Sequence, residues 1–462
     1  MKNRLVVYIL IIVLSSLLTH FLFFGHPNET VFDEVHFGKF ISGYFTHEYF
    51  FDIHPPLGKL LISGMGYLAG FRPGFSFAEI GQKFPDNTYL WLRLLPTLAG
   101  ILLPLVVFFL VLRLGLSRIA AFTAAMLVVF ENALLVQSRF ILLDSFLLLF
   151  GFSALLAYFK YAQENKILYL FLSGAFAVLS LSVKWTGTTF LAIILILYFT
   201  NKNVWKLNFQ TFVYRLCALV ITPLAIYFSI FTIHLGLLTK SGPGDAFMSL
   251  GFQKMLVGST VNAEGYRPLG LIAKFVELNL KMYGANTNLT AGHPYSSKWY
   301  TWPFMTRPIY YWYSSTGLEQ ASRIYFLGNP VIWWASTVAM LYLLISLARS
   351  ISGLAMTRIR TYEIARHKIK FLPALLGGAY LLNLLPFVGI TRAMFLYHYM
   401  IGLIFAIIAL VYLLDQLENK KKVFTIFLIA SFVAFIFFAP LTYGLPLSEK
   451  AYHLRNWLSS WI

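Results

Sequence analysis

The chain has 462 residues, of which 59% are hydrophobic, 18% aromatic and only 12% charged. Soluble domains are about half apolar and about a quarter charged, so this composition excludes a soluble globular fold and indicates a protein surrounded largely by lipid. A single cysteine, Cys217, excludes an intramolecular disulfide and a cysteine zinc cluster, and its apolar surroundings favour a buried side chain over a reactive thiol.

Apolar stretches close to the length of about 20 residues that a helix needs to cross a bilayer recur along the chain. We therefore predict an all-α polytopic membrane protein with about 11 transmembrane helices. The first stretch lacks a small-residue cleavage site, so we interpret it as a retained helix rather than a signal peptide. The two stretches beside Lys184 are short and barely separated. The predicted spans cover 5–24, 89–112, 119–137, 140–159, 167–183, 187–200, 212–235, 329–347, 373–390, 399–414 and 423–440.

The basic residues set the predicted orientation, because short cytoplasmic loops are rich in Lys and Arg. With the N-terminus inside, seventeen of the 36 Lys and Arg residues fall in inner segments, whereas the three short outer turns hold only Arg139, Lys184 and Arg392. The net charge of +18 thus mostly reflects the orientation of the chain in the membrane. We expect the basic residues to lie next to anionic lipid headgroups rather than nucleic acid.

Two long outer loops divide the predicted chain into three parts. Residues 1–235 form an N-terminal transmembrane catalytic module that includes the first loop, 25–88. Residues 236–328 form the second loop, and residues 329–462 form a C-terminal transmembrane module. Long ordered loops tend to carry function, so we expect the site at the outer face.

The first loop opens with adjacent carboxylates, Asp33 and Glu34. Neighbouring residues on a helix point about 100° apart, so one carboxylate can face a site while the other pairs elsewhere. A partly desolvated carboxylate has a raised pKa and can act as a general base. The alternative is that Asp33 caps a short helix whose first turn carries Glu34.

The same loop continues with His54-Pro55-Pro56, followed by an apolar stretch from Leu57 to Phe71 that is too short to span. We expect a rigid turn and then a helix lying at the membrane interface. His54 is either a site residue or a histidine that holds the turn by hydrogen bonds.

Several outer charges come from distant parts of the chain but share one membrane level. Arginine side chains fork onto phosphate oxygens, and a departing phosphate needs cations near its developing charge. Arg93, near the outer end of a span, either serves such a site or extends to the headgroups. Asp144 lies five residues after Arg139, which makes a direct helical pair awkward and predicts another partner. The set is Asp33, Glu34, Arg93, Arg139, Asp144, Lys184 and Arg392.

The second loop is rich in aromatic residues around Trp302 and Arg307. Aromatic side chains interleaved with polar ones suit sugar stacking, and they equally suit an interfacial belt. We treat Trp302 and Arg307 as candidate contacts of the loop with an acceptor. No cluster of metal-ligating residues stands out in the sequence.

Taken in order, these motifs resemble the protein O-mannosyltransferases over nearly the whole chain. Each motif is modest alone, but the ordered set is specific. The motifs are Asp33-Glu34, His54-Pro55-Pro56-Leu57-Gly58-Lys59, Ser138-Arg139-Phe140-Ile141-Leu142-Leu143-Asp144, Ser182-Val183-Lys184-Trp185, Ser296-Ser297, Trp302-Pro303, Arg307-Pro308, Gly328-Asn329-Pro330, Trp333-Trp334 and Arg392-Ala393-Met394-Phe395-Leu396-Tyr397-His398-Tyr399.

The resemblance implies the lipid-carrier-dependent glycosyltransferase (GT-C) fold and inverting transfer of mannose from a polyprenyl or dolichyl phosphate to Ser or Thr of exported proteins. It places Asp33 at the family's catalytic acidic position, with Glu34 beside it, and Arg93 at the family's essential arginine. Arg93, Lys184, Arg392 and the outer neighbours of these residues would bind lipid phosphate or sugar. Those neighbours are His54, Arg139 and Asp144.

The second loop is short for the β-trefoil domain of eukaryotic members, so we expect a bacterial-type enzyme of the cell membrane with an extracytoplasmic site. No cofactor is expected beyond the donor lipid, and a divalent-metal requirement stays open. One rival enzyme transfers another lipid-linked sugar, such as aminoarabinose, to a glycolipid. A transporter of lipid-linked anions would place its charges near the bilayer midplane, which the clustering at one face disfavours.

Overall fold

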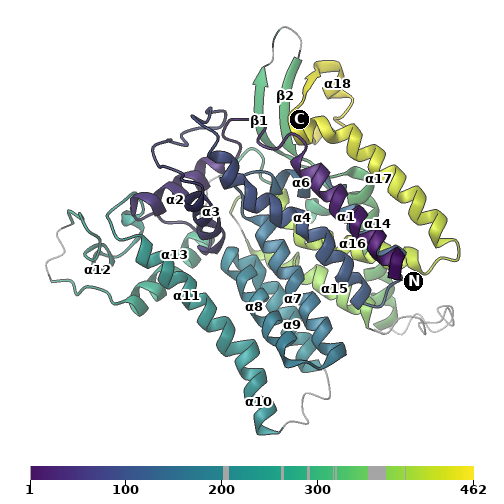
Figure 1. Cartoon of the computed structure of the whole chain (residues 1–462), viewed down its shortest axis with the longest axis horizontal. Coiled ribbons are helices and arrows are strands. Elements are labelled where there is room, and N and C mark those ends of the chain that lie inside the picture. Colours follow the sequence, from purple (N-terminus) through teal and green to yellow (C-terminus); the bar gives the residue numbers. More distant parts are fainter. Residues whose placement is uncertain are drawn as a thin grey trace.

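The computed structural model describes residues 2–200, 208–261, 265–288, 292–315, 317, 320–351, 371–390 and 392–461. A bundle of long helices forms the body of the molecule (Figure 1). The short helices α2 (Glu34–Thr46) and α3 (Leu57–Leu68) lie to one side of its upper end. The hairpin of β1 (Ile309–Ser315) and β2 (Gln320–Phe326) projects from the top, next to α18 (Glu449–His453). The predicted inner loop around Arg358, Arg360, Arg366, Lys368 and Lys370 lies outside the described residues.

Within the described ranges, eight helical segments are long and apolar enough to cross a membrane, or up to nine if one bent pair counts as a span. A multi-pass membrane protein is therefore confirmed, whereas the count of eleven stays a prediction. The spanning segments are α1 (Lys2–Phe21), α4 (Tyr89–Arg113), α7 (Asp144–Glu164), α10 (Phe209–Leu216) continuing through η3 (Cys217–Ile221) into α11 (Thr222–Leu237), α14 (Pro330–Ile351), α15 (Leu372–Leu382) with η7 (Leu385–Gly389), α16 (Met400–Asp415) and α17 (Lys420–Tyr443).

The bent pair occupies the predicted span 119–137, which is broken into α5 (Arg118–Val129) and α6 (Asn132–Ser138) at an angle of 59°. The carboxylate of Glu131 lies at the break and accepts hydrogen bonds from the backbone N–H groups of Ala133 and Asn329. This buried anchor fixes the bend, and α6 carries Gln137 toward the outer ends of the neighbouring helices.

Two shorter apolar helices account for the remaining predicted spans, α8 (Ile167–Val183) and α9 (Thr188–Thr200). Lys184 lies between them in extended backbone, and η1 (Trp185–Gly187) follows. A Cβ atom at Gly187 would lie 2.5 Å from the backbone of Ser180, so the chain doubles back tightly here. This close turn presents Lys184 at the end of the helix pair.

The segments between the long helices, together with the C-terminal segment, contain short helices and one small sheet. The stretch after His54 forms a helix, as expected, and its place at the membrane interface stays a prediction. The three-stranded antiparallel sheet, in the order β1-β2-β3, was not predicted, because β3 comes from the C-terminal segment. The elements are α2 (Glu34–Thr46), α3 (Leu57–Leu68), η4 (Asp245–Phe247), α12 (Leu250–Gln253), α13 (Leu271–Asn288), η5 (Trp299–Phe304), β1 (Ile309–Ser315), β2 (Gln320–Phe326), η8 (Leu396–Tyr399), β3 (Pro446–Ser448), α18 (Glu449–His453) and η9 (Ser459–Trp461).

The predicted module boundaries fall close to helix ends. The boundary at 235/236 lies near the end of α11 at Leu237, and the boundary at 328/329 lies just before α14 begins at Pro330. Whether these parts are separate units stays a prediction.

The charge distribution gives a testable topology. Reporter fusions placed after Lys422 and after Ile462 should report opposite sides of the membrane, because α17 separates them. A fusion after Arg113, at the end of α4, should match the one after Lys422. Equal signals from the fusions after Lys422 and Ile462 would reject the predicted orientation.

Candidate active site

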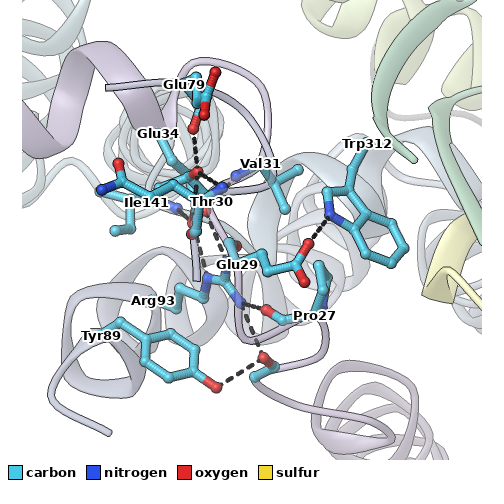
Figure 2. Close-up of polar contacts among 12 residues, drawn as sticks. Pro27, Glu29, Thr30, Val31, Glu34, Glu79, Tyr89, Arg93, Ile141 and Trp312 are labelled. Carbon is cyan, nitrogen blue, oxygen red and sulfur yellow. Dashed lines mark hydrogen bonds and ion pairs between the residues drawn. The ribbon is translucent and has the colours of Figure 1, made fainter. Parts of the chain in front are cut away.

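A fully buried ion pair between Glu34 and Arg93 anchors the first outer loop (Figure 2). Nε and Nη2 of Arg93 donate to the two carboxylate oxygens at 2.8 and 2.7 Å. Nη1 donates to the carbonyls of Gly25 and Pro27, and Nη2 also donates to that of Glu29. An arginine has five N–H donors, and these five bonds use all of them. We therefore replace the predicted phosphate contact of Arg93 with a role in holding the loop.

The carboxylate of Glu34 is equally committed. Besides Arg93, it accepts hydrogen bonds from the backbone N–H groups of Val31 and Ile141, both at 2.9 Å. It thus joins the start of α2 to the segment that follows Arg139. Glu34 is thus the carboxylate that pairs elsewhere, and it has no free oxygen for proton transfer.

Asp33 lies beside this pair but has a different environment. It occupies the N-cap position of α2, yet its side chain makes no cap hydrogen bond and no other hydrogen bond within the described ranges. The capping interpretation is therefore not supported. Burial raises the pKa of Asp33 to about 7, with the charge of Lys184 lowering it and those of Asp144 and Asp52 raising it. Asp33 is a carboxylate that can take up a proton near neutral pH.

Asp144 pairs with Lys184 rather than with Arg139. The ammonium of Lys184 lies 2.8 Å from both carboxylate oxygens, and Gln137 Nε2 donates to Oδ2 at 2.6 Å. The expectation that Asp144 has a partner other than Arg139 is confirmed. With three accepted hydrogen bonds, Asp144 is a counter-ion held in place, whereas Asp33 remains uncommitted.

A cavity of about 60 Å³ brings together four of the predicted residues, His54, Asp144, Lys184 and Arg392. It lies where the first loop, the turn after α8 and η8 meet. The other residues that line it are Ile53, Leu147, Trp185, Thr186, Asn286, Tyr397, His398, Met400 and Ile401. An apolar groove of about 820 Å³ between α7, α9 and α15 contains none of the predicted site residues.

Arg392 is the cation of this cavity that lacks a protein partner. It is half-buried, and within the described ranges it makes no hydrogen bond or ion pair. Burial lowers its pKa from the ordinary value, but an arginine stays charged at neutral pH. Its fork of donors is therefore available to an anion in the cavity.

Arg139 lies apart from these residues. It is buried against α17, where its guanidinium lies 4.4 Å from the ring centroid of Tyr443 and Nη2 donates to the carbonyl of Phe23 at 2.6 Å. It does not line the cavity that holds Lys184 and Arg392. Sequence order could not show this, because the turn after α6 directs Arg139 toward α1 and α17.

The His54 turn is held by a second buried ion pair that sequence reasoning missed. Lys59 Nζ pairs with Asp52 and donates to the carbonyls of His54 and Pro55 at 2.9 and 3.2 Å. Burial, together with nearby positive charges led by Lys184, holds the pKa of His54 well below its usual value. The sequence did contain a signal for this ion pair, because Asp52 and Lys59 carry opposite charges on either side of the paired prolines. The ring of His54 faces the cavity as a neutral group.

The two candidate residues of the second loop support the site from a distance. Trp302 is fully buried, donates to Ser297 Oγ at 2.9 Å and stacks on His398 at 5.6 Å. Arg307 donates to the carbonyls of Pro294 and Ser460 at 3.0 and 3.2 Å. Neither residue lines the cavity. Across the described part of the chain, no group of three or more His, Cys, Asp or Glu side chains is arranged to hold a metal ion.

Comparison with known families gives a consistent result. A family model described as dolichyl-phosphate-mannose-protein mannosyltransferase matches residues 10–239, and one described as the C-terminal four TMM region of protein-O-mannosyltransferase matches residues 271–461. Protein O-mannosyltransferase 1 of Drosophila melanogaster is 36% identical over 274 residues, which are 55% of this chain and 30% of that protein. Dolichyl-phosphate-mannose--protein mannosyltransferase 4 of Candida albicans is 37% identical over 271 residues, 55% of this chain and 36% of that protein.

These alignments span about a third of the length of the curated relatives. Among solved structures, the Saccharomyces cerevisiae Pmt1-Pmt2 complex bound to the sugar donor matches with a TM-score of 0.89 and 21% identity, over 99% of this chain and 93% of that one. The oligosaccharyltransferase AglB of Archaeoglobus fulgidus matches with a TM-score of 0.54 and 13% identity, over 99% and 58%. The expected fold of lipid-carrier-dependent glycosyltransferases is thereby confirmed.

The buried pair predicts a large stability effect at Arg93. Arg93→Gln leaves the carboxylate of Glu34 buried without a counter-ion, which typically costs about 3–5 kcal/mol. Arg113→Gln, on the same helix, breaks a partly exposed pair with Glu164 and should cost about 1 kcal/mol or less. Thermal unfolding of the purified variants measures both. If Arg93→Gln unfolds like the wild type and only weakens donor binding, Arg93 contacts the phosphate after all.

Proposed function

The chain belongs to the protein O-mannosyltransferase family, and on that premise we propose that it transfers mannose from a dolichyl or polyprenyl phosphate to Ser or Thr hydroxyls of exported proteins. The transfer inverts the anomeric centre and takes place at the extracytoplasmic face of a bacterial cell membrane. The predicted charge split and the gathering of candidate residues in the outer loops support this placement.

A single displacement needs a base for the acceptor hydroxyl, because a neutral hydroxyl is a poor nucleophile. Three carboxylates lie near one another, and their hydrogen bonds distinguish them. Glu34 accepts four bonds and Asp144 accepts three, whereas the side chain of Asp33 accepts none within the described part of the chain. This contrast is the observation that carries the proposal, and it assigns the base to Asp33.

The leaving group is a phosphate, which departs as an anion and needs positive charge rather than a proton donor. Lys184 is already compensated by Asp144, so the pair is a positioned dipole at the cavity wall. Arg392 has free donors facing the same cavity and would supply the forked contact to phosphate oxygens. Neutral His54 would add a hydrogen bond without adding charge.

One assay tests the function directly. Purified protein is incubated with radiolabelled polyprenyl-phosphate mannose and a Ser/Thr-rich peptide, and we expect label in the peptide. Label in a glycolipid instead would favour the rival transferase with a lipid acceptor. Label in neither acceptor, with the donor bound but intact, would reject the proposed reaction.

Loss of Arg392 should weaken donor binding. Hydrogen bonds to charged groups contribute about 1.5–3 kcal/mol, so Arg392→Gln should raise the KM for the donor about tenfold to a hundredfold. Arg72→Gln removes a positive charge from an exposed position of the first loop and should leave KM unchanged. Equal effects of the two variants would indicate general attraction of the anionic donor rather than a contact.

Loss of the base should abolish turnover while binding persists. Asp33→Asn should lower kcat about 10²–10⁴-fold and leave donor affinity within a few fold. Asp86→Asn, an exposed carboxylate of the same loop, is the matched control and should behave as wild type. Near-normal turnover in Asp33→Asn together with an inactive Asp144→Asn would exchange the two roles.

The pH profile gives the same assignment an independent check. The base works only when deprotonated, so a pKa of about 7 predicts that kcat/KM rises as pH increases through about 7 and levels off above it. The residual rate of Asp33→Asn should lack this rise. If kcat/KM of Asp33→Asn still rises with pH as in the wild type, the group that titrates is not Asp33.

A further inference from the structure

Tyr311 is a fully buried residue of β1 that belongs to neither the first loop nor the helix pair α8–α9. The hairpin that carries it stands beside α6 at the outer end of the bundle (Figure 1). Tyr311 nevertheless contacts both halves of the candidate active site. Its ring and backbone contact the residue before Asp33, and its hydroxyl begins a chain of hydrogen bonds that ends at Lys184.

The first contact fixes the loop that presents Asp33. The ring of Tyr311 stacks on Phe32 with centroids 4.1 Å apart and planes within 7°. Its carbonyl accepts a hydrogen bond from the backbone N–H of Phe32 at 3.1 Å. Phe32 has a φ of +47°, a left-handed conformation that a bulky residue adopts only when its surroundings impose it. Stacking and hydrogen bond together hold this turn, and the turn directs the next side chain, Asp33.

The second contact reaches the cavity. The hydroxyl of Tyr311 donates to Gln137 Oε1, which fixes the orientation of that amide. Gln137 Nε2 can then donate to Asp144 Oδ2 at 2.6 Å, and Asp144 holds the ammonium of Lys184 at 2.8 Å. Without the hydroxyl, the buried Oε1 of Gln137 would lose its donor, and the amide would be free to turn away from Asp144.

We propose that Tyr311 is a positioning residue that sets the distance between the base Asp33 and the Asp144–Lys184 pair at the cavity wall. The inference rests on the proposed function. In that reaction the acceptor oxygen bonds to the anomeric carbon as the carbon–oxygen bond to phosphate breaks, Asp33 takes the hydroxyl proton, and the phosphate leaves with the electron pair. The base acts on one side of the sugar carbon, and the cavity that would hold the leaving phosphate lies on the other. Their separation therefore controls the rate, and a 1 Å misplacement can cost about a hundredfold.

The test removes only the hydroxyl. Tyr311→Phe keeps the stacking on Phe32 and the backbone hydrogen bond but breaks the link to Gln137. We expect kcat for peptide mannosylation to fall about tenfold to a hundredfold while KM for the donor stays within about threefold. The matched control is Tyr325→Phe on the neighbouring strand β2, which removes a buried hydroxyl bonded to Tyr452 instead. This control should keep the wild-type kcat even if its unfolding temperature falls.

Gln137→Met breaks the same chain at its next member and keeps the side-chain volume. It should reproduce the fall in kcat, and the double variant with Tyr311→Phe should lose little more than either single variant, since both remove one link. Equal kcat in Tyr311→Phe and wild type, or equal losses in Tyr311→Phe and Tyr325→Phe, would overturn the inference while the function stands. A wild-type protein that transfers no mannose would overturn the proposed function and the inference together.

Discussion

The ion pair between Glu34 and Arg93 is the constraint on which the outer half of the molecule depends. Removing two charges from water costs several kcal/mol for each, and this cost is offset only when every donor and acceptor finds a partner. Here the guanidinium fulfils that condition with two carboxylate contacts and three carbonyls of the first loop. The loop has little freedom to move without exposing an unpaired buried charge.

The same arrangement gives the adjacent carboxylates of Glu34 and Asp33 different roles: Glu34 is held in an ion pair, and Asp33 is left without a hydrogen-bond donor in the part of the chain that the structure describes. Three buried ion pairs surround the site, and in each of them a lysine or arginine compensates the carboxylate. Two charged residues near these pairs differ from them. The side chain of Asp33 accepts no hydrogen bond, and Arg392 has no carboxylate partner, within the described residues. Asp33 and Arg392 are costly to keep in this state, and the neighbouring pairs hold them there. Most of the buried charges around the site therefore stabilise the fold, and few are available to bind or react with a substrate.

The sequence predicted the parts of this arrangement that depend on local periodicity. Apolar length located the long helices, and the 100° step between neighbours predicted that Asp33 and Glu34 would point apart. The five-residue spacing made a pair between Arg139 and Asp144 awkward and predicted another partner, which is Lys184. The sequence shows the charge of an arginine but not its hydrogen-bond partners. It could not distinguish Arg93, whose donors are all used within the protein, from Arg392, whose donors are available to a ligand. Tyr311 and β3 were missed, because their roles arise from contacts between segments far apart in the chain.

The pairing of β3 with β2 has a consequence for biosynthesis. The free edge of β2 receives its partner only from residues 446–448, which are made after α14, α16 and α17. At about 5–20 residues per second, the nascent hairpin waits on the order of ten seconds with an unpaired edge. Such an edge can pair with other chains. The edge of β2 that pairs with β3 is therefore closed only after the last membrane helix, α17, has been made.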